Sequence, residues 1–168
     1  MATYDYTTGQ GAGAAGSATG LSKMMMVERV FDAKKFKDAG NTMANGDIIQ
    51  LIDLPAECFV LHVGAEVLTA FDPGTSLTVD IDVAEGDDMI DGGDVTSAGY
   101  LAAGSNGHSD YTAVATYNNR YTATDTIDVK CILSGDAPSV GKLRVYAVLI
   151  DISGNIEEDL LYSSPNVQ

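Results

Sequence analysis

SLTVDIDVA, residues 76–84, is the stretch that decides the fold, because its apolar and polar side chains alternate without a break. The odd-numbered residues from 77 to 83 are all aliphatic, and Asp80 and Asp82 stand between them. A two-residue period places alternate side chains on opposite faces of an extended strand. The stretch therefore predicts a strand with one face on an apolar core and the other face acidic.

Other segments of the chain have the same strand-like character, and turn residues separate them. The segments expected to form strands are 23–32, 47–55, 57–71, 111–117, 120–135 and 141–153. No long stretch has a 3.6-residue apolar period, and only residues 33–39 suit a short helix, of about two turns. Seven or eight short strands with turns between them predict an all-β fold of two packed sheets, a β-sandwich.

Two local patterns predict how the strands are arranged. Asp72-Pro73-Gly74 is a turn signal between 57–71 and 76–84, which predicts that these two strands form a hairpin. The segment KMMMVERVFD, residues 23–32, has apolar residues at both odd and even positions. It is therefore expected to be a strand that is covered on both faces.

The N-terminal segment differs from the rest of the chain in composition. Residues 8–20 read TGQGAGAAGSATG and offer almost nothing to bury, so we expect them to become ordered only against another subunit. The chain is accordingly divided into an extended arm, residues 1–22, and a single β-sandwich domain, residues 23–168. The candidates for binding a partner follow the arm directly: Lys23, Met24, Met25, Met26 and Arg29.

The formal net charge of −15 is unevenly distributed along the chain. Residues 1–40 carry a net charge of +1, which leaves −16 on the remaining 128 residues. A body that acidic repels phosphate backbones, so we expect no nucleic-acid partner. No apolar run approaches the roughly 18 residues that a membrane-spanning helix needs, so we expect no membrane partner.

The two cysteines, Cys58 and Cys131, both fall inside predicted strands and outside any metal-binding spacing. Two buried free thiols are the favoured interpretation, since free cysteine is among the most buried residue types. A disulfide that joins two strands is the alternative, and sequence alone leaves it open.

An acidic segment is the one candidate for a metal site. Seven carboxylates fall within the fifteen residues 80–94, and such oxygen-rich clusters can bind Ca²⁺ or Mg²⁺. The EF-hand spacing is not met, because Ala84 stands where its third ligand would be. A solvated acidic face is therefore favoured over a weak cation site, whose candidate ligands are Asp80, Asp82, Asp87, Asp88 and Asp91.

No catalytic residues can be assigned from the sequence. His62 and His108 lack a neighbouring nucleophile or a partner at metal-ligand spacing, so we expect a protein that is not an enzyme. Tyrosines gather in the second half of the chain, where they could mark an interface or pack in the core. These are Tyr100, Tyr111, Tyr117, Tyr121 and Tyr146.

Four pieces of the sequence together resemble one family. They are DIIQLIDLPAECFVLHVGAEVLTAF (47–71), LTVDIDVAEGDDMIDGGDV (77–95), YTATDTIDVKCIL (121–133) and GKLRVYAVLIDIS (141–153). In their order along the chain and in their residue patterns, they resemble the small capsid decoration, or cement, proteins of tailed bacteriophages. The resemblance covers about two-thirds of the chain.

This resemblance implies a jelly-roll-like antiparallel β-sandwich without enzymatic activity. It implies a virion protein on the outer capsid surface, assembled in the host cytoplasm, whose partners are the major capsid protein and further copies of itself. A trimer is the first expectation for the homo-oligomer, and the N-terminal arm is expected to attach the domain to the shell.

A rival function remains open at this point. The chain could instead be a carbohydrate- or receptor-binding β-sandwich that uses the acidic segment 85–110, with or without bound Ca²⁺. In the decoration function no cofactor is needed.

Overall fold

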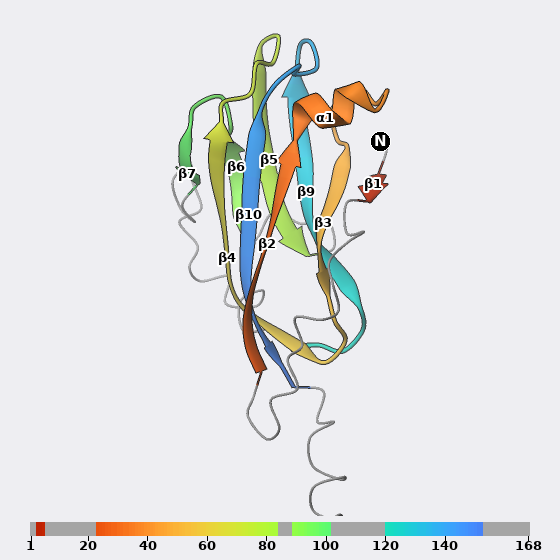
Figure 1. The fold of residues 1–168 in the computed structure, drawn as a ribbon, viewed down its shortest axis with the longest axis vertical. Helices are drawn as coiled ribbons and strands as arrows, with labels where there is room; N and C mark the ends of the chain where they lie inside the picture. Colours follow the sequence, from red (N-terminus) through yellow and green to blue (C-terminus); the bar gives the residue numbers. More distant parts are fainter. Residues whose placement is uncertain (1–2, 6–22, 84–88, 102–119, 153–168) are drawn as a thin grey trace, which may run out of the picture.

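The computed structural model describes residues 3–5, 23–83, 89–101 and 120–152, and these form a sandwich of two β-sheets (Figure 1). Sheet A has the strand order β1 (Thr3–Asp5), β3 (Ile48–Leu54), β9 (Asp125–Ser134), β5 (Ser76–Val83) and β6 (Ile90–Asp94). Sheet B has the order β2 (Lys23–Asp32), β10 (Lys142–Asp151), β4 (Cys58–Thr69) and β7 (Gly99–Leu101), with β8 (Arg120–Tyr121) paired to β4. Every pairing is antiparallel except the short parallel contact of β1 with β3.

The strand pairs are nested in the manner of a jelly roll. The hairpin β5–β6 lies innermost in the chain order, and β4 pairs with β7, β3 with β9, and β2 with β10 around it. The nested pairs belong alternately to sheet A and sheet B, so the folded ribbon rolls up into two layers. The predicted all-β sandwich is confirmed, and the strand order is that of a jelly roll.

One apolar core fills the space between the two sheets. In β5 the residues that face it are the ones the alternation predicts, and Val79 and Ile81 are almost fully buried. Opposite them, Val145 and Ala147 of β10 are also buried. At one end Phe31 stacks on Phe71, with ring centroids 6.4 Å apart, so the core extends over most of the sandwich.

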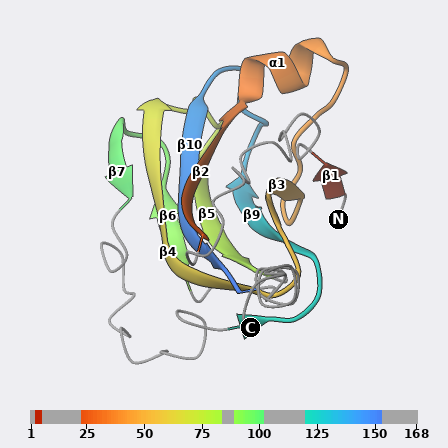
Figure 2. The same ribbon diagram turned by 60° about the horizontal axis from the view of Figure 1, so that its bottom comes forward.

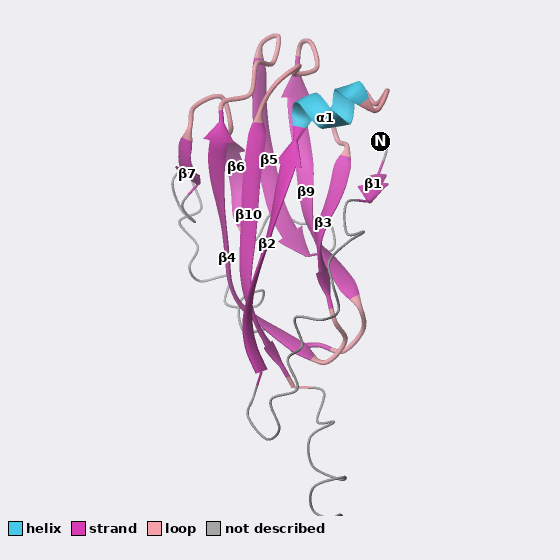
Figure 3. Ribbon diagram, viewed as in Figure 1, coloured by secondary structure: helices cyan, strands magenta, loops and turns pink. Residues whose placement is uncertain are grey.

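The single helix of the described residues, α1 (Ala33–Asp38), closes one end of the sandwich (Figures 2 and 3). It begins because the Asp32 carboxylate accepts hydrogen bonds from the backbone N–H groups of Lys34 and Lys35. Phe36 is buried and its ring packs edge-on against Phe31 at 5.6 Å. The described residues contain no helix long and apolar enough to cross a membrane.

The predicted hairpin between 57–71 and 76–84 is wrong. β4 lies in sheet B and β5 in sheet A, so the turn at Asp72 carries the chain from one sheet to the other. The Asp72 carboxylate accepts hydrogen bonds from Ser139 and from the backbone N–H of Val140, 67 and 68 residues away. The sequence does predict a turn at Asp72-Pro73-Gly74, but turn residues allow a crossover between sheets as readily as a hairpin.

The predicted acidic loop 85–110 also differs from the structure where that part is described. It contains β6 and β7, and Asp80 of β5 accepts a hydrogen bond from Gly92 of β6 at 3.0 Å. Gly92 has a φ of +61°, and the β5–β6 register shifts between Val79 and Ile81. This irregular pairing needs a glycine. β6 therefore lacks the alternating apolar residues from which a strand is predicted.

Several predicted features lie outside the described residues. These are the arm apart from β1, the predicted strand 111–117, the candidates Asp87, Asp88, His108, Tyr111 and Tyr117, and the tail beyond residue 152.

Candidate interaction surface

The outward face of sheet B carries exposed apolar side chains. Alternate residues of β2 face the core, and Met25 and Val27 pack against it. The residues between them face outward, and Met24 and Met26 are 68 % and 67 % exposed. The prediction that this strand is covered on both faces is therefore wrong for the chain on its own, because only one of its apolar sets is buried.

The same face continues across the neighbouring strands. Met24 lies opposite Ile150 and Met26 opposite Val148, and both β10 residues are half-buried. Val30, also exposed, lies opposite Arg144. On β7, Tyr100 is 69 % exposed and lies opposite Glu66. We call this surface the sheet-B face; it carries Met24, Met26, Val30, Tyr100, Val148 and Ile150.

Charges on the sheet-B face are largely balanced. The Arg144 guanidinium forms an ion pair with Glu66 through Nη2, and its Nη1 lies 3.8 Å from the Glu28 carboxylate. These three side chains come from three adjacent strands, β10, β4 and β2. The face therefore combines apolar side chains with a cross-strand ion network, a composition typical of protein interfaces.

The middle of the face is held by aromatic packing. The Tyr146 ring lies over Gly64 of β4, where a β-carbon would overlap the ring. The His62 ring is 5.9 Å from that of Tyr146, with the rings tilted at 45°. Gly64 thus lets Tyr146 lie flat along the sheet, which keeps this part of the face level.

The free edge of β2 borders the sheet-B face. On its other side β2 pairs with β10 over ten residues without a register shift. No strand of the described ranges pairs with the remaining edge. Arg29 lies on this strand, and its Nε is buried without a hydrogen-bond partner.

Of the five predicted partner-binding residues, the structure brings two, Met24 and Met26, onto the exposed face. Met25 is turned toward the core, Arg29 is half-buried, and Lys23 is the first residue of β2. Sequence reasoning missed Val30, Glu66 and Arg144. The signal for Val30 was present, because the even-numbered positions of β2 include three apolar residues that the core does not need.

Comparisons with known proteins found similar structures but no family model and no curated relative. A chain in the capsid structure of Ralstonia phage GP4 is 15 % identical and has a TM-score of 0.53; the match covers 89 % of this chain and 96 % of that one. The two chains share a fold.

Weaker matches come from two further phage capsid structures. The cyanophage Pam1 capsid contains a chain with 16 % identity and a TM-score of 0.42, and the match covers 79 % of this chain and 88 % of that one. The acidic stable capsid of Helicobacter pylori bacteriophage KHP30 contains one with 12 % identity and a TM-score of 0.41, covering 77 % and 93 %.

The candidate metal ligands are only partly described. Asp80 and Asp82 are buried on β5, so the predicted solvated acidic face is wrong for these two residues, whereas Asp91 is exposed on β6. Asp80 accepts from Gly92 and lies 3.8 Å from the Lys130 ammonium, so it ties strands together. Within the described ranges no three His, Cys, Asp or Glu residues are grouped to hold a metal ion.

The rival site is also partly described. Asp94 lies at the end of β6 and accepts hydrogen bonds from the hydroxyl and the backbone N–H of Thr96. These bonds, the hydroxyl foremost, lower the pKa of its carboxyl. The carboxylate therefore stabilises the turn between β6 and β7, which is a structural role.

Both cysteines are free and buried. Cys58 lies on β4 and Cys131 on β9, so they belong to different sheets. Burial raises the pKa of the Cys58 thiol to about 11 and that of Cys131 to about 12. Because the thiolate is the reactive form, both groups are inert at neutral pH, and the favoured interpretation from sequence is confirmed.

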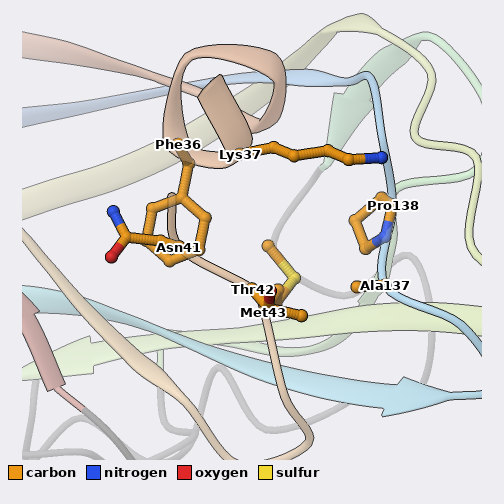
Figure 4. Close-up of a pocket in the computed structure, with 7 residues that line it drawn as sticks. All are labelled: Phe36, Lys37, Asn41, Thr42, Met43, Ala137 and Pro138. Carbon is orange, nitrogen blue, oxygen red and sulfur yellow. The ribbon is translucent and has the colours of Figure 1, made fainter. Parts of the chain in front are cut away.

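A small pocket of about 140 Å³ lies beside α1 (Figure 4). Phe36, Met43 and Pro138 supply apolar walls, and Lys37 is its one charged lining residue. Its lining contains no carboxylate, histidine or cysteine. Its polar side chains are those of Lys37, Asn41 and Thr42.

Proposed function

We propose that the chain is a structural protein of a phage virion that decorates the capsid shell and bridges neighbouring shell subunits. The fold shared with a chain of the Ralstonia phage GP4 capsid supports this proposal. That match covers nearly all of both chains, so the likeness extends over the whole sandwich. The sequence resemblance to decoration proteins points the same way.

The observation that carries the proposal is the sheet-B face. Seven large apolar residues of the described ranges are exposed, and four of them, Met24, Met26, Val30 and Tyr100, lie on this one face. Exposed apolar side chains gathered on one side mark a protein-binding surface. A protein whose task is attachment needs such a surface and needs no catalytic site.

The rest of the molecule suits the same task. A close-packed sandwich is a stiff block that transmits force between its contacts. Many such contacts on a symmetric shell reinforce one another through multivalency. The predicted arm, residues 1–22, precedes β2 in the chain, and its strand β1 pairs with β3 of the same chain. We propose that the rest of the arm extends this attachment to the major capsid protein. The acidic body would face outward, away from the packaged genome.

The test is binding to phage heads that lack this protein. We expect the double substitution Met24→Asp and Met26→Asp to reduce the number of bound copies at least tenfold, since a tenfold change corresponds to about 1.4 kcal/mol and two exposed methionines would supply more than that on burial. Bound copies are counted by quantitative gel analysis of sedimented heads. Removal of residues 1–22 is measured in the same way.

A matched control comes from the other sheet. Ile132 is exposed on the outward face of sheet A, so Ile132→Asp adds the same type of charge to an apolar surface position elsewhere. This variant is expected to bind as the unmodified chain does. Full binding by the double variant, or equal loss with the control, would overturn the proposal.

A further inference from the structure

β2 has the properties of an edge that is prepared for pairing with another strand. It is ten residues long, contains neither Gly nor Pro, and keeps a continuous register with β10. Natural sheets usually protect such an edge with charges, prolines or bulges, because a flat apolar edge recruits further strands. Four of the ten residues of β2 are charged, but the exposed positions 24 and 26 hold methionines.

The charge of β2 favours a second copy of the same chain as the partner. The chain carries −15 overall, so two copies repel one another over most of their surface. β2 is an exception, because Lys23 and Arg29 balance Glu28 and Asp32 within the strand. Two copies can therefore approach through this edge without a local excess of like charge.

We infer that β2 pairs antiparallel with β2 of a second copy, about a two-fold axis that passes through Val27. This inference rests on the proposed function and assigns a partner to the free edge of β2, which borders the sheet-B face described there. The contact is isologous, so it closes at two copies. It joins the two B sheets into one continuous sheet across the dimer.

The pattern of residues selects this register. In an antiparallel pair, residues that lie directly opposite share a face. With Val27 on the axis, Met24 lies opposite the partner's Val30 and Met26 opposite the partner's Glu28. No like charges are then opposed, and the apolar ends of the strand meet.

The two adjacent registers oppose like charges. If Glu28 lies on the axis, it faces the partner's Glu28. If Met26 lies on the axis, Arg29 faces the partner's Lys23. Like charges directly opposite one another destabilise a strand pair, so the register at Val27 is favoured over both.

Disulfide trapping tests the register. In Val27→Cys the two new thiols face each other across the axis, at a Cα separation that a disulfide spans. We expect mild oxidation to convert this variant to covalent dimers. A mixture of Met25→Cys and Arg29→Cys chains with different tags is expected to give the mixed disulfide, because these residues oppose one another, and each alone is expected to remain largely unlinked.

The buried native cysteines do not interfere with this test, and a surface variant provides its control. Cys58 and Cys131 are buried, so neither competes for oxidation in the folded chain. Ile132→Cys places an exposed thiol on sheet A and should form no covalent dimer on oxidation. If Val27→Cys is linked no better than Ile132→Cys, or if the mixed pair fails to link, the inference is overturned.

The mass in solution gives the second readout. We expect sedimentation equilibrium to show a dimer. We expect Met26→Glu to raise its dissociation constant at least tenfold while the circular dichroism spectrum is unchanged, because the new carboxylate lies opposite the partner's Glu28. A monomer or a trimer overturns the inference, the trimer being the state that the sequence resemblance implies. Normal head binding by a monomeric chain would leave the proposed function intact, whereas a trapped dimer that does not bind heads would contradict that function alone.

Discussion

The outward faces of the two sheets are opposite in character. On sheet A the residues that point away from the core include the acidic side chains Asp80, Asp82 and Asp128, yet each is only 4 % exposed. On sheet B the outward residues include Met24 and Met26, which are mostly exposed. Polar groups are thus buried on one face and apolar groups are exposed on the other.

This contrast separates two roles that a sheet face can have. Buried carboxylates are tolerated only with partners, and Asp80 and Asp128 accept hydrogen bonds from Gly92 and Thr126. The outward side chains of sheet A therefore stabilise the fold itself. Exposed methionines contribute little to the isolated fold, which is why we propose that the outward face of sheet B contacts another chain.

Removing a core side chain should affect both faces at once, and it has the largest expected effect. Phe31 is buried and packs against Phe36 and Phe71. We expect Phe31→Ala to lower the free energy of unfolding by about 3–5 kcal/mol, through lost burial and the cavity left behind. Urea denaturation followed by circular dichroism measures the change. A loss below about 1 kcal/mol would show that the two sheets do not share this core.

Asp80→Ala tests the structural role of the face on sheet A. The substitution removes the acceptor for Gly92 N–H and the partner of Lys130, so we expect a loss of about 1–3 kcal/mol. Asp91→Ala is the control, since Asp91 is exposed on the neighbouring strand β6 and should change stability by less than about 0.5 kcal/mol. Equal effects of the two would break the contrast between buried and solvated carboxylates.

The connection between the sheets should show a modest pH dependence. Hydrogen bonds from the Ser139 hydroxyl and then from Val140 lower the pKa of the Asp72 carboxyl below its usual value of 3.8. A carboxyl with a lowered pKa in the folded state stabilises the fold above the unfolded pKa, and this contribution is lost as the pH falls through the folded pKa. Asp72→Asn should therefore be less stable at pH 7, by up to about 1 kcal/mol for the weakened hydrogen bonds.

Thermal melts of Asp72→Asn and of the unmodified chain across this range give the measurement. The difference between the two should shrink as the pH drops below 3.8. Asp136→Asn, an exposed carboxyl in the neighbouring turn, serves as the control. A difference that stays constant with pH would show that the charge of Asp72 plays no part.

The smallest effect on stability is expected on the sheet-B face. Met26→Ser removes an exposed side chain, so the free energy of unfolding should change by no more than about 0.5 kcal/mol. Thermal melts at low protein concentration provide the measurement, because association would otherwise add to the stability. A loss near that of Asp80→Ala would mean that the methionine belongs to the fold and not to an interface.

The strands with regular alternation could be predicted from the sequence, because their faces differ in polarity. This is true of β5 and β10, whose apolar residues are buried at the expected positions, although Asp80 and Asp82 of β5 are buried as well. β6 escaped prediction because its sequence IDGGD has a single apolar residue and is held by a bond from Gly92 to Asp80. The crossover at Asp72 escaped too, since its partners lie far away in the chain.

The candidate surface was predictable only in part. The sequence indicates the methionines of β2 as partner-binding candidates, but the same apolar pattern also predicts that both faces of the strand are covered. Periodicity reveals that a face is apolar without revealing what covers it. The ion network of Glu28, Glu66 and Arg144 depends on the order of strands in sheet B, which no local pattern contains.

The pairing of β2 with β10 also has a mechanical consequence. Lys23 lies opposite Asp151, so the start of β2 and the end of β10 are neighbours at one end of the sandwich (Figure 1). Tension applied between these two strand ends would separate β2 from β10 one residue pair at a time. It would not shear all ten residue pairs together. A domain built in this way resists force poorly when it is pulled through the start of β2 and the end of β10. It resists force well when it is loaded across its two sheets.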